Sequence, residues 1–198
     1  ACLLSFQHHQ GYWWAELSSD TARASASILL PLWLHPPLNG VWEPPNRPLI
    51  EKAVQSILSR QLIDGGFNIY PEGPSDISAT VKAYFALKLA GLDYYDQRLV
   101  RVRERILALG GIQAANSYVK INLSLFDLFP REHVPAIPPE IMLLPGKLIY
   151  QMSSWTRAIV IPLAIVHAMN PKRPVPAGFD LKELFLPGVS LNFSRDPQ

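Results

Sequence analysis

The 198-residue chain is long enough to form one domain with a hydrophobic core, and its 48% of hydrophobic residues excludes a disordered polypeptide. The 18 basic and 16 acidic side chains leave a net charge of +2, which gives no reason to expect a nucleic-acid partner. The single cysteine, Cys2, excludes an internal disulfide framework and a cysteine-rich zinc site. We expect no metal site and no cofactor.

The first predicted element belongs to a motif that occurs twice. Residues 1–4 have the apolar character of a helix end, and the segment Gln7-His8-His9-Gln10-Gly11-Tyr12-Trp13 follows them. It recurs as Gln61-Leu62-Ile63-Asp64-Gly65-Gly66-Phe67. The copies share a glutamine, a glycine and an aromatic residue at the same spacing: Gln7, Gly11 and Trp13, then Gln61, Gly65 and Phe67. A repeat of this kind predicts helix pairs that bury their apolar faces by stacking on their neighbours.

Helices are predicted along most of the chain. One follows Ser19-Asp20, and another begins at Pro48 and is expected to end at Asp64-Gly65-Gly66, where glycine can adopt the positive φ of a C-terminal cap. Ser75-Asp76 is expected to cap the start of a helix that ends at Gly91. Because no segment alternates with a period of two, the chain is predicted to be all-α.

Three further helices are predicted after Gly91. The first spans about 96–109, ends at Gly110-Gly111 and exposes a face of arginines to solvent. The second spans about 113–129 and carries four apolar residues on one face: Tyr118, Ile121, Leu125 and Leu128. The third spans about 153–169. Its most apolar part, Ala158–Met169, is shorter than the ~20 residues that cross a bilayer, so it is predicted to be a buried core helix.

The repeated glutamine has a physical role in such a fold. At the end of a helix, its side-chain amide can reach the free carbonyl groups of its own helix or the free N–H groups of a neighbour. Each copy would then join adjacent helix pairs. We expect Gln7 and Gln61 to lie near helix ends, beside the aromatic residue of their own motif.

The two copies resemble the glutamine–tryptophan repeat of the squalene–hopene cyclase family, the bacterial class II triterpene cyclases. The resemblance implies an incomplete α/α barrel, or toroid, of stacked helix pairs over residues 1–186, and a tail or linker over residues 187–198. It also implies the family activity, a triterpene cyclase that protonates squalene and closes its rings to hopene or hopanol in hopanoid biosynthesis. Five segments carry it: Gly11-Tyr12-Trp13-Trp14, Tyr70-Pro71-Glu72-Gly73-Pro74-Ser75-Asp76, Ala79-Thr80-Val81-Lys82-Ala83-Tyr84-Phe85-Ala86-Leu87-Lys88, Pro139-Glu140-Ile141-Met142 and Ser154-Trp155-Thr156-Arg157-Ala158.

The resemblance implies partners as well as a reaction. The ligand would be squalene or a related isoprenoid, the remaining cyclase domain would pair with this one, and the protein would associate peripherally with the cytoplasmic side of a membrane. Two departures stand out. The acidic Asp-x-Asp-Asp motif of the family is absent from these 198 residues, and Arg23-Ala24-Ser25-Ala26-Ser27 stands where relatives usually carry acidic residues and a tyrosine.

No catalytic residue is therefore expected in this chain, and whether it is an enzyme by itself stays open. By position in the matching motifs, the resemblance implies that Trp155 and Tyr118 line the substrate cavity, where aromatic faces stabilise carbocations. It implies that Met152 and Val160 narrow the substrate channel. Ordinary helix core is the alternative role for all four side chains. For the whole chain, the alternative to part of a cyclase is a non-catalytic remnant or a helical module that binds an apolar isoprenoid.

Overall fold

The computed structural model describes residues 2–14, 20–36, 43–143, 148–189 and 191, and helices are the only regular secondary structure among them. The α-helices are α1 (Cys2–Ser5), α2 (Thr21–Leu34), α3 (Arg47–Leu58), α4 (Ile77–Leu89), α5 (Gln97–Ala108), α6 (Ser117–Leu125), α7 (Leu148–Gln151) and α8 (Ser154–Met169). Short 3₁₀ turns accompany them: η1 (Ile112–Ala114), η2 (Arg131–His133), η3 (Pro139–Leu143) and η4 (Lys182–Leu184). Within the described residues, the prediction of an all-α chain is confirmed.

Most of the longer helices start at a side-chain cap that is visible in the sequence. The capping oxygen accepts a hydrogen bond from a backbone N–H two or three residues further on, at 2.8–3.1 Å. Such a cap satisfies one of the N–H groups that have no partner within the helix. The capping residues are Asp20 for α2, Asp76 for α4, Asp96 for α5, Asn116 for α6 and Ser153 for α8.

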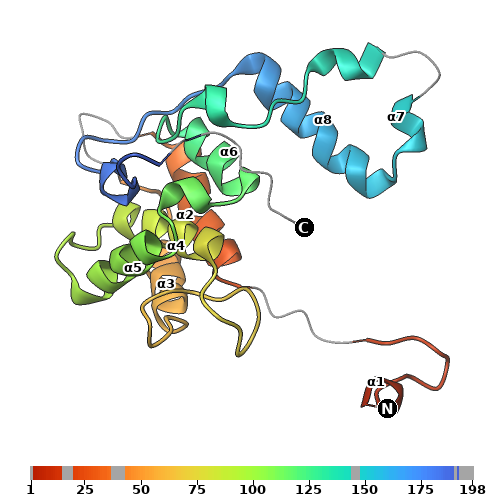
Figure 1. Ribbon diagram of the computed structural model, residues 1–198, viewed down its shortest axis with the longest axis horizontal. Coiled ribbons are helices and arrows are strands. Elements are labelled where there is room, and N and C mark those ends of the chain that lie inside the picture. Colours follow the sequence, from red (N-terminus) through yellow and green to blue (C-terminus); the bar gives the residue numbers. More distant parts are fainter. Residues whose placement is uncertain (1, 15–19, 37–42, 144–147, 190, 192–198) are drawn as a thin grey trace.

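Helices α2 to α6 pack together into one helical body, and α4 lies at its centre. Nearly all of its side chains are buried, and Tyr84, Phe85 and Leu87 are at most 1% exposed. The helix packs against α2 and α5 and also contacts α3 and α6, as its central place in Figure 1 shows. A helix with neighbours on so many sides needs no polar face, which explains the nearly continuous apolar sequence of α4.

α5 has the amphipathic pattern that the sequence predicts. Leu99, Val102 and Ile106 are fully buried, whereas the arginines of the helix are exposed or half-buried. The predicted helix ends at glycine are confirmed here and in α4. Gly91 follows α4 with φ +98°, and Gly110 and Gly111 follow α5 with φ +104° and +70°. These backbone angles favour glycine because a side chain would crowd the adjacent carbonyl.

Two helices are shorter than the sequence predicts. α3 ends at Leu58, and Gly65 does not cap it. The chain instead enters a tight turn, in which the Gly65 N–H donates to the Leu62 carbonyl oxygen and the Leu62 N–H donates to the Gly66 carbonyl oxygen, both at 3.0 Å. α6 spans Ser117–Leu125 rather than 113–129, because residues 112–114 form the separate turn η1 and the cap at residue 116 starts a new helix.

Of the apolar face of α6, Ile121 and Leu125 are partly buried against the core. Val119 and Leu123 are buried, whereas Tyr118 is 54% exposed. The N–H of Asn116, the cap of this helix, donates to the Ser78 hydroxyl of α4 at 2.9 Å. This anchor orients α6 against α4 and turns the side with Val119 and Leu123 inward.

α8 starts and ends where the sequence predicts, but the prediction that it is a buried core helix is wrong. Ala164 is its only buried residue, and Ile165 and Met169 are 52% and 73% exposed. Figure 1 shows α7 and α8 projecting from the helical body. The helix contacts η3, and Arg131 Nη2 donates to the Val166 carbonyl oxygen at 3.0 Å. The described residues thus supply too little packing surface to cover its apolar side chains.

The carboxy-terminal segment is tied to α4 by a buried polar cluster. Glu183 Oε1 accepts hydrogen bonds from the Tyr84 hydroxyl at 2.8 Å and from Lys88 Nζ at 2.7 Å. Lys88 Nζ also donates to the Asp180 carbonyl oxygen. Burial, together with the Glu183 carboxylate, raises the pKa of the Tyr84 hydroxyl. Further along, the Gln113 side chain exchanges two hydrogen bonds with the backbone at residue 186. The domain boundary at residue 186 stays a prediction.

Candidate functional site

The second copy of the repeat joins α3 to α5. Gln61 Nε2 donates to the Gly65 carbonyl oxygen at 3.1 Å, which closes the turn, and to the Arg98 carbonyl oxygen at 3.0 Å, which reaches the first turn of α5. The expectation that this glutamine lies near a helix end and joins neighbouring helices is therefore confirmed for Gln61. Its partner on the neighbour differs from the expected one, because the amide donates to a carbonyl group and does not accept from a free N–H.

Gly65 lies directly against the backbone of α5. Its φ is +87°, and a Cβ atom added there would lie 2.6 Å from the Arg101 carbonyl oxygen. Real Cβ atoms do not approach a backbone oxygen so closely. The turn therefore needs glycine both for its backbone conformation and for its contact with α5.

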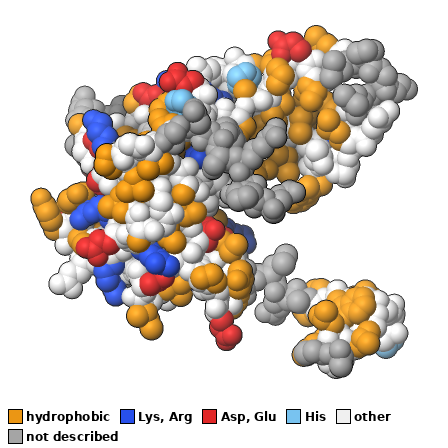
Figure 2. Space-filling model, viewed as in Figure 1, with side chains coloured by type: hydrophobic (Ala, Val, Ile, Leu, Met, Phe, Trp, Pro, Cys, Tyr) orange, Lys and Arg blue, Asp and Glu red, His pale blue; other side chains and the backbone are white. Residues whose placement is uncertain are grey.

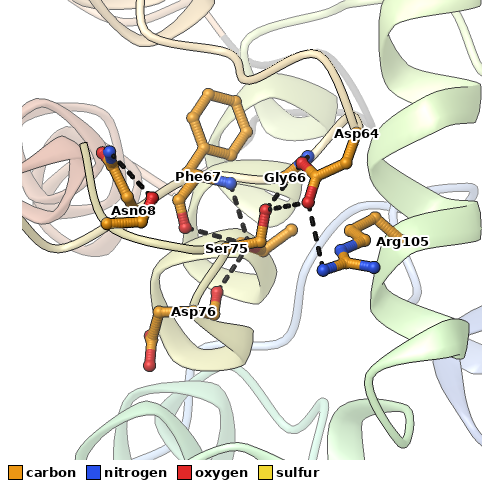
Figure 3. A network of polar contacts seen from close by, with 9 residues as sticks. Asp64, Gly66, Phe67, Asn68, Ser75, Asp76 and Arg105 are labelled. Carbon is orange, nitrogen blue, oxygen red and sulfur yellow. Dashed lines mark hydrogen bonds and ion pairs between the residues drawn. The ribbon is translucent and has the colours of Figure 1, made fainter.

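A polar network holds the turn in place (Figure 3). The Ser75 hydroxyl lies 2.7 and 2.8 Å from the two carboxylate oxygens of Asp64, the Gly66 N–H donates to Asp64 Oδ1 at 3.0 Å, and Arg105 Nη2 lies 3.0 Å from Asp64 Oδ2. Burial acts to raise the pKa of Asp64, but these donors and the guanidinium outweigh it, so the pKa lies below its usual value. Sequence reasoning placed Ser75 only at the start of the next helix and the arginines of α5 only on a solvent-exposed face, and the fold brings Ser75 and Arg105 together at Asp64.

Phe67 fixes the same turn to the start of α4. Its side chain is fully buried in the core. Its N–H donates to the Thr80 hydroxyl at 3.1 Å, and its carbonyl oxygen accepts from the Asp76 N–H at 2.9 Å. The second copy is thus a structural joint between α3, α4 and α5.

The first copy has the same local turn but no such packing. Gln7 Nε2 donates to the Gly11 carbonyl oxygen at 2.8 Å, and Gly11 has φ +88°. The Trp13 indole N–H donates to the Leu3 carbonyl oxygen at 2.7 Å, yet its side chain is 53% exposed. A Cβ atom added to Gly11 would meet no atom within 4 Å. Figure 1 shows this segment, with α1, apart from the helical body.

Three of the four predicted substrate-binding residues lie in α6 or α8, and the fourth precedes α8. Trp155 is in the first turn of α8 and 76% exposed, and Tyr118 is in α6 and 54% exposed. Val160 of α8 and Met152, which precedes the helix, are half-buried. The described part of the chain does not by itself enclose either aromatic ring, so a role in a cavity stays a prediction for all four residues.

A groove that sequence reasoning missed lies between α2, α4 and α6. Its volume is about 230 Å³. The walls are mostly apolar, and Lys82 of α4 supplies the ammonium group among the lining residues. Three segments far apart in the sequence form it, so no local pattern could reveal it. The lining residues are Ala26, Leu29, Leu30, Trp33, Lys82, Asn122, Leu125 and Phe126.

The described residues contain neither a metal-binding cluster nor a membrane-spanning helix. No group of three or more histidine, cysteine, aspartate or glutamate side chains in the described ranges could hold a metal ion. Among the helices of those ranges, none is long and apolar enough to cross a membrane.

Comparisons with known proteins agree with this architecture. The chain matches the family model of the squalene–hopene cyclase N-terminal domain over residues 1–196. It is 36% identical to the squalene–hopene cyclase of Zymomonas mobilis, over 98% of this chain and 29% of the relative. It is 34% identical to that of Alicyclobacillus acidocaldarius, over 92% of this chain and 28% of the relative, and 31% identical to the dammaradiene synthase of Dryopteris crassirhizoma, over 94% and 26%.

The chain thus spans less than a third of the length of these relatives. An all-helical structure without strands in the described ranges is what the helical N-terminal domain of an α/α toroid requires. On the strength of a match that covers nearly every residue, this chain belongs to the squalene–hopene cyclase family and corresponds to its N-terminal domain.

Proposed function

We propose that this chain is the amino-terminal domain of a class II triterpene cyclase, which acts on squalene or a related isoprenoid together with the remaining cyclase domain. The family match over residues 1–196 carries the proposal. The coverage of relatives supports a division of labour, because a chain that corresponds to 29% of a squalene–hopene cyclase leaves most of that enzyme to other residues.

We further propose that the described chain lacks the acid that starts cyclisation. Protonation of an alkene needs a carboxylic acid that is protonated, but hydrogen bonds and a neighbouring guanidinium lower the pKa of Asp64 and of Asp96. Asp64 accepts hydrogen bonds from two donors and pairs with Arg105, and Glu183 pairs with Lys88. Asp96 has a pKa of about 2, because of its hydrogen bond from Arg98. None of these groups is suited to donate a proton to a hydrocarbon.

The exposed apolar side chains of α8 support a partner for this part of the molecule. Trp155, Ile165 and Met169 are all more than half exposed. Figure 2 shows hydrophobic side chains over the projecting part of the molecule that contains α7 and α8. Exposed apolar patches of this kind mark surfaces that contact protein, membrane or ligand. In our proposal α8 contacts the remaining cyclase domain, its aromatic residue faces the substrate, and the assembled enzyme lies peripherally on the cytoplasmic side of a membrane.

Complementation tests the proposal. The chain would be produced alone and together with a fragment of the Zymomonas mobilis cyclase that contains the residues it does not match. Each sample would then receive detergent-dispersed squalene. We expect no product from the chain alone and polycyclic triterpenes from the pair, detected by mass spectrometry. In the active pair, Trp155→Ala should lower turnover or divert the products, whereas Tyr95→Ala, at an exposed residue before α5, should not. Product from the chain alone would contradict the proposal, as would an active pair indifferent to Trp155→Ala.

A non-catalytic module that binds an apolar isoprenoid is the second candidate, and the groove between α2, α4 and α6 favours it. At about 230 Å³ the groove is smaller than the roughly 300–1,000 Å³ of a typical small-molecule site, so it would hold only one end of a squalene molecule. Reading the coding sequence past Gln198 separates the two functions. An Asp-x-Asp-Asp motif in frame supports the cyclase, and a stop codon supports the module.

A further inference from the structure

The groove between α2, α4 and α6 brings one ammonium group to an apolar surface. Leu29, Trp33 and Phe126 are among the side chains that form its walls, and Lys82 projects from α4 into the same lining. Lys82 is half-buried. Burial lowers its pKa, which means that the charged amine has lost part of its hydration.

The charge of Lys82 is not neutralised within the described part of the chain. No hydrogen bond and no ion pair within 4 Å involves its side chain there. Asp20 is the carboxylate that acts on it, at longer range, and it partly opposes the effect of burial. One oxygen of Asp20 is already engaged, because Oδ1 accepts the Ala22 N–H at 2.9 Å as the cap of α2. A desolvated ammonium without a close counter-ion favours an anionic ligand.

We propose that this groove binds a single-chain amphiphile with one carboxylate, such as a fatty acid. Lys82 Nζ would donate to the carboxylate, and the first carbons of the chain would lie along Leu29, Trp33 and Phe126. Charge complementarity and the apolar walls carry the proposal. It goes beyond the cyclase function, because squalene is a hydrocarbon without a charged group.

The number of cations in the groove decides between a carboxylate and a polyphosphate head. Lys82 is the cationic side chain of the lining. The guanidinium of Arg173 lies outside it, exposed, 5.8 Å from the centre of the Trp33 ring. An isoprenoid diphosphate carries several negative charges and needs several donors at once, whereas a monocarboxylate needs one. The volume of about 230 Å³ likewise suits the head and first carbons of a chain better than a bulky head group.

Equilibrium dialysis tests the proposal, because it measures bound ligand whatever the association state of the protein. The 198-residue chain would be dialysed against radiolabelled decanoate or decanol, each below its micelle or solubility limit. We expect decanoate to bind on the order of tenfold more tightly than decanol, since only the carboxylate forms a charge-assisted bond. Lys82→Met should abolish that preference and Lys82→Arg should retain it. Lys52→Met, at an exposed lysine of α3, is the matched control and should change nothing.

A second variant separates binding in the groove from loss of folding. Ala26→Phe fills the groove from the exposed side of α2 and should weaken decanoate and decanol alike, while the far-ultraviolet circular dichroism stays that of the parent chain. Equal binding of the two ligands, or a preference that survives Lys82→Met, would overturn the proposal. Absence of binding would overturn it too, and would assign the groove to a protein surface, either a second copy or the remaining cyclase domain. None of these results bears on squalene cyclisation by the complemented pair.

Discussion

Gly65→Ala should destabilise the contact of the turn between α3 and α4 with α5 by about 2–5 kcal/mol. The left-handed backbone, with φ +87°, costs an alanine roughly 1–2 kcal/mol. The new methyl group would also lie 2.6 Å from the Arg101 carbonyl oxygen, and relief of such overpacking costs roughly 1–3 kcal/mol. The equivalent change in the first copy, Gly11→Ala, has the backbone cost alone, because no atom lies within 4 Å of the added methyl group.

Hydrogen–deuterium exchange with peptide-level mass spectrometry resolves the two effects. For Gly65→Ala, amide exchange in α5 and in residues 61–67 should accelerate by a factor of about 30 or more, the factor that corresponds to roughly 2 kcal/mol. For Gly11→Ala, exchange should change within residues 2–14 and stay unchanged in α5. Equal exchange of α5 in both variants would refute the reasoning, because it would mean that the contact between Gly65 and Arg101 contributes nothing.

Three further outcomes are expected. The pKa of Asp64 is depressed, so its contribution to stability is present above the unfolded-state pKa near 3.8 and is lost as the pH falls through the folded-state pKa. In thermal melts at a series of pH values, Asp64→Asn should therefore reduce the loss of stability on acidification. Since Asp64 is 39% exposed, solvent screening limits that contribution to about 1 kcal/mol or less, and a larger loss at pH 7 would count against it. Glu183→Leu should destabilise the fold by roughly 3–5 kcal/mol, because it leaves the buried Lys88 without its ion-pair partner. Adding Lys88→Met should recover part of that loss in the same melts, whereas additive losses from the two changes would exclude the pairing. The isolated chain should self-associate in light scattering through the apolar side chains of α8, and Ile165→Lys should reduce this; a monomer with one sharp melting transition would disprove it.

Sequence alone determined the features that depend on neighbouring residues. The caps Asp20, Asp76 and Ser153 start their helices where the pattern predicts, because a capping side chain bonds to a backbone N–H only two or three residues away. The glycines after α4 and α5 likewise mark helix ends through their own backbone angles. The repeat, too, was visible in the sequence, since Gln7 and Gln61 each close the same local turn.

Tertiary structure decided everything that depends on which surfaces meet. Gly65 looked like a helix cap, but its position is set by the backbone of α5, which comes more than 30 residues later. α8 has the composition of a core helix and lies exposed, because burial depends on a partner surface and not on the helix itself. Lys82 is one of several lysines in the sequence. Only the convergence of α2, α4 and α6 places its charge in an apolar groove, because contacts between distant segments leave no periodic pattern in any one of them.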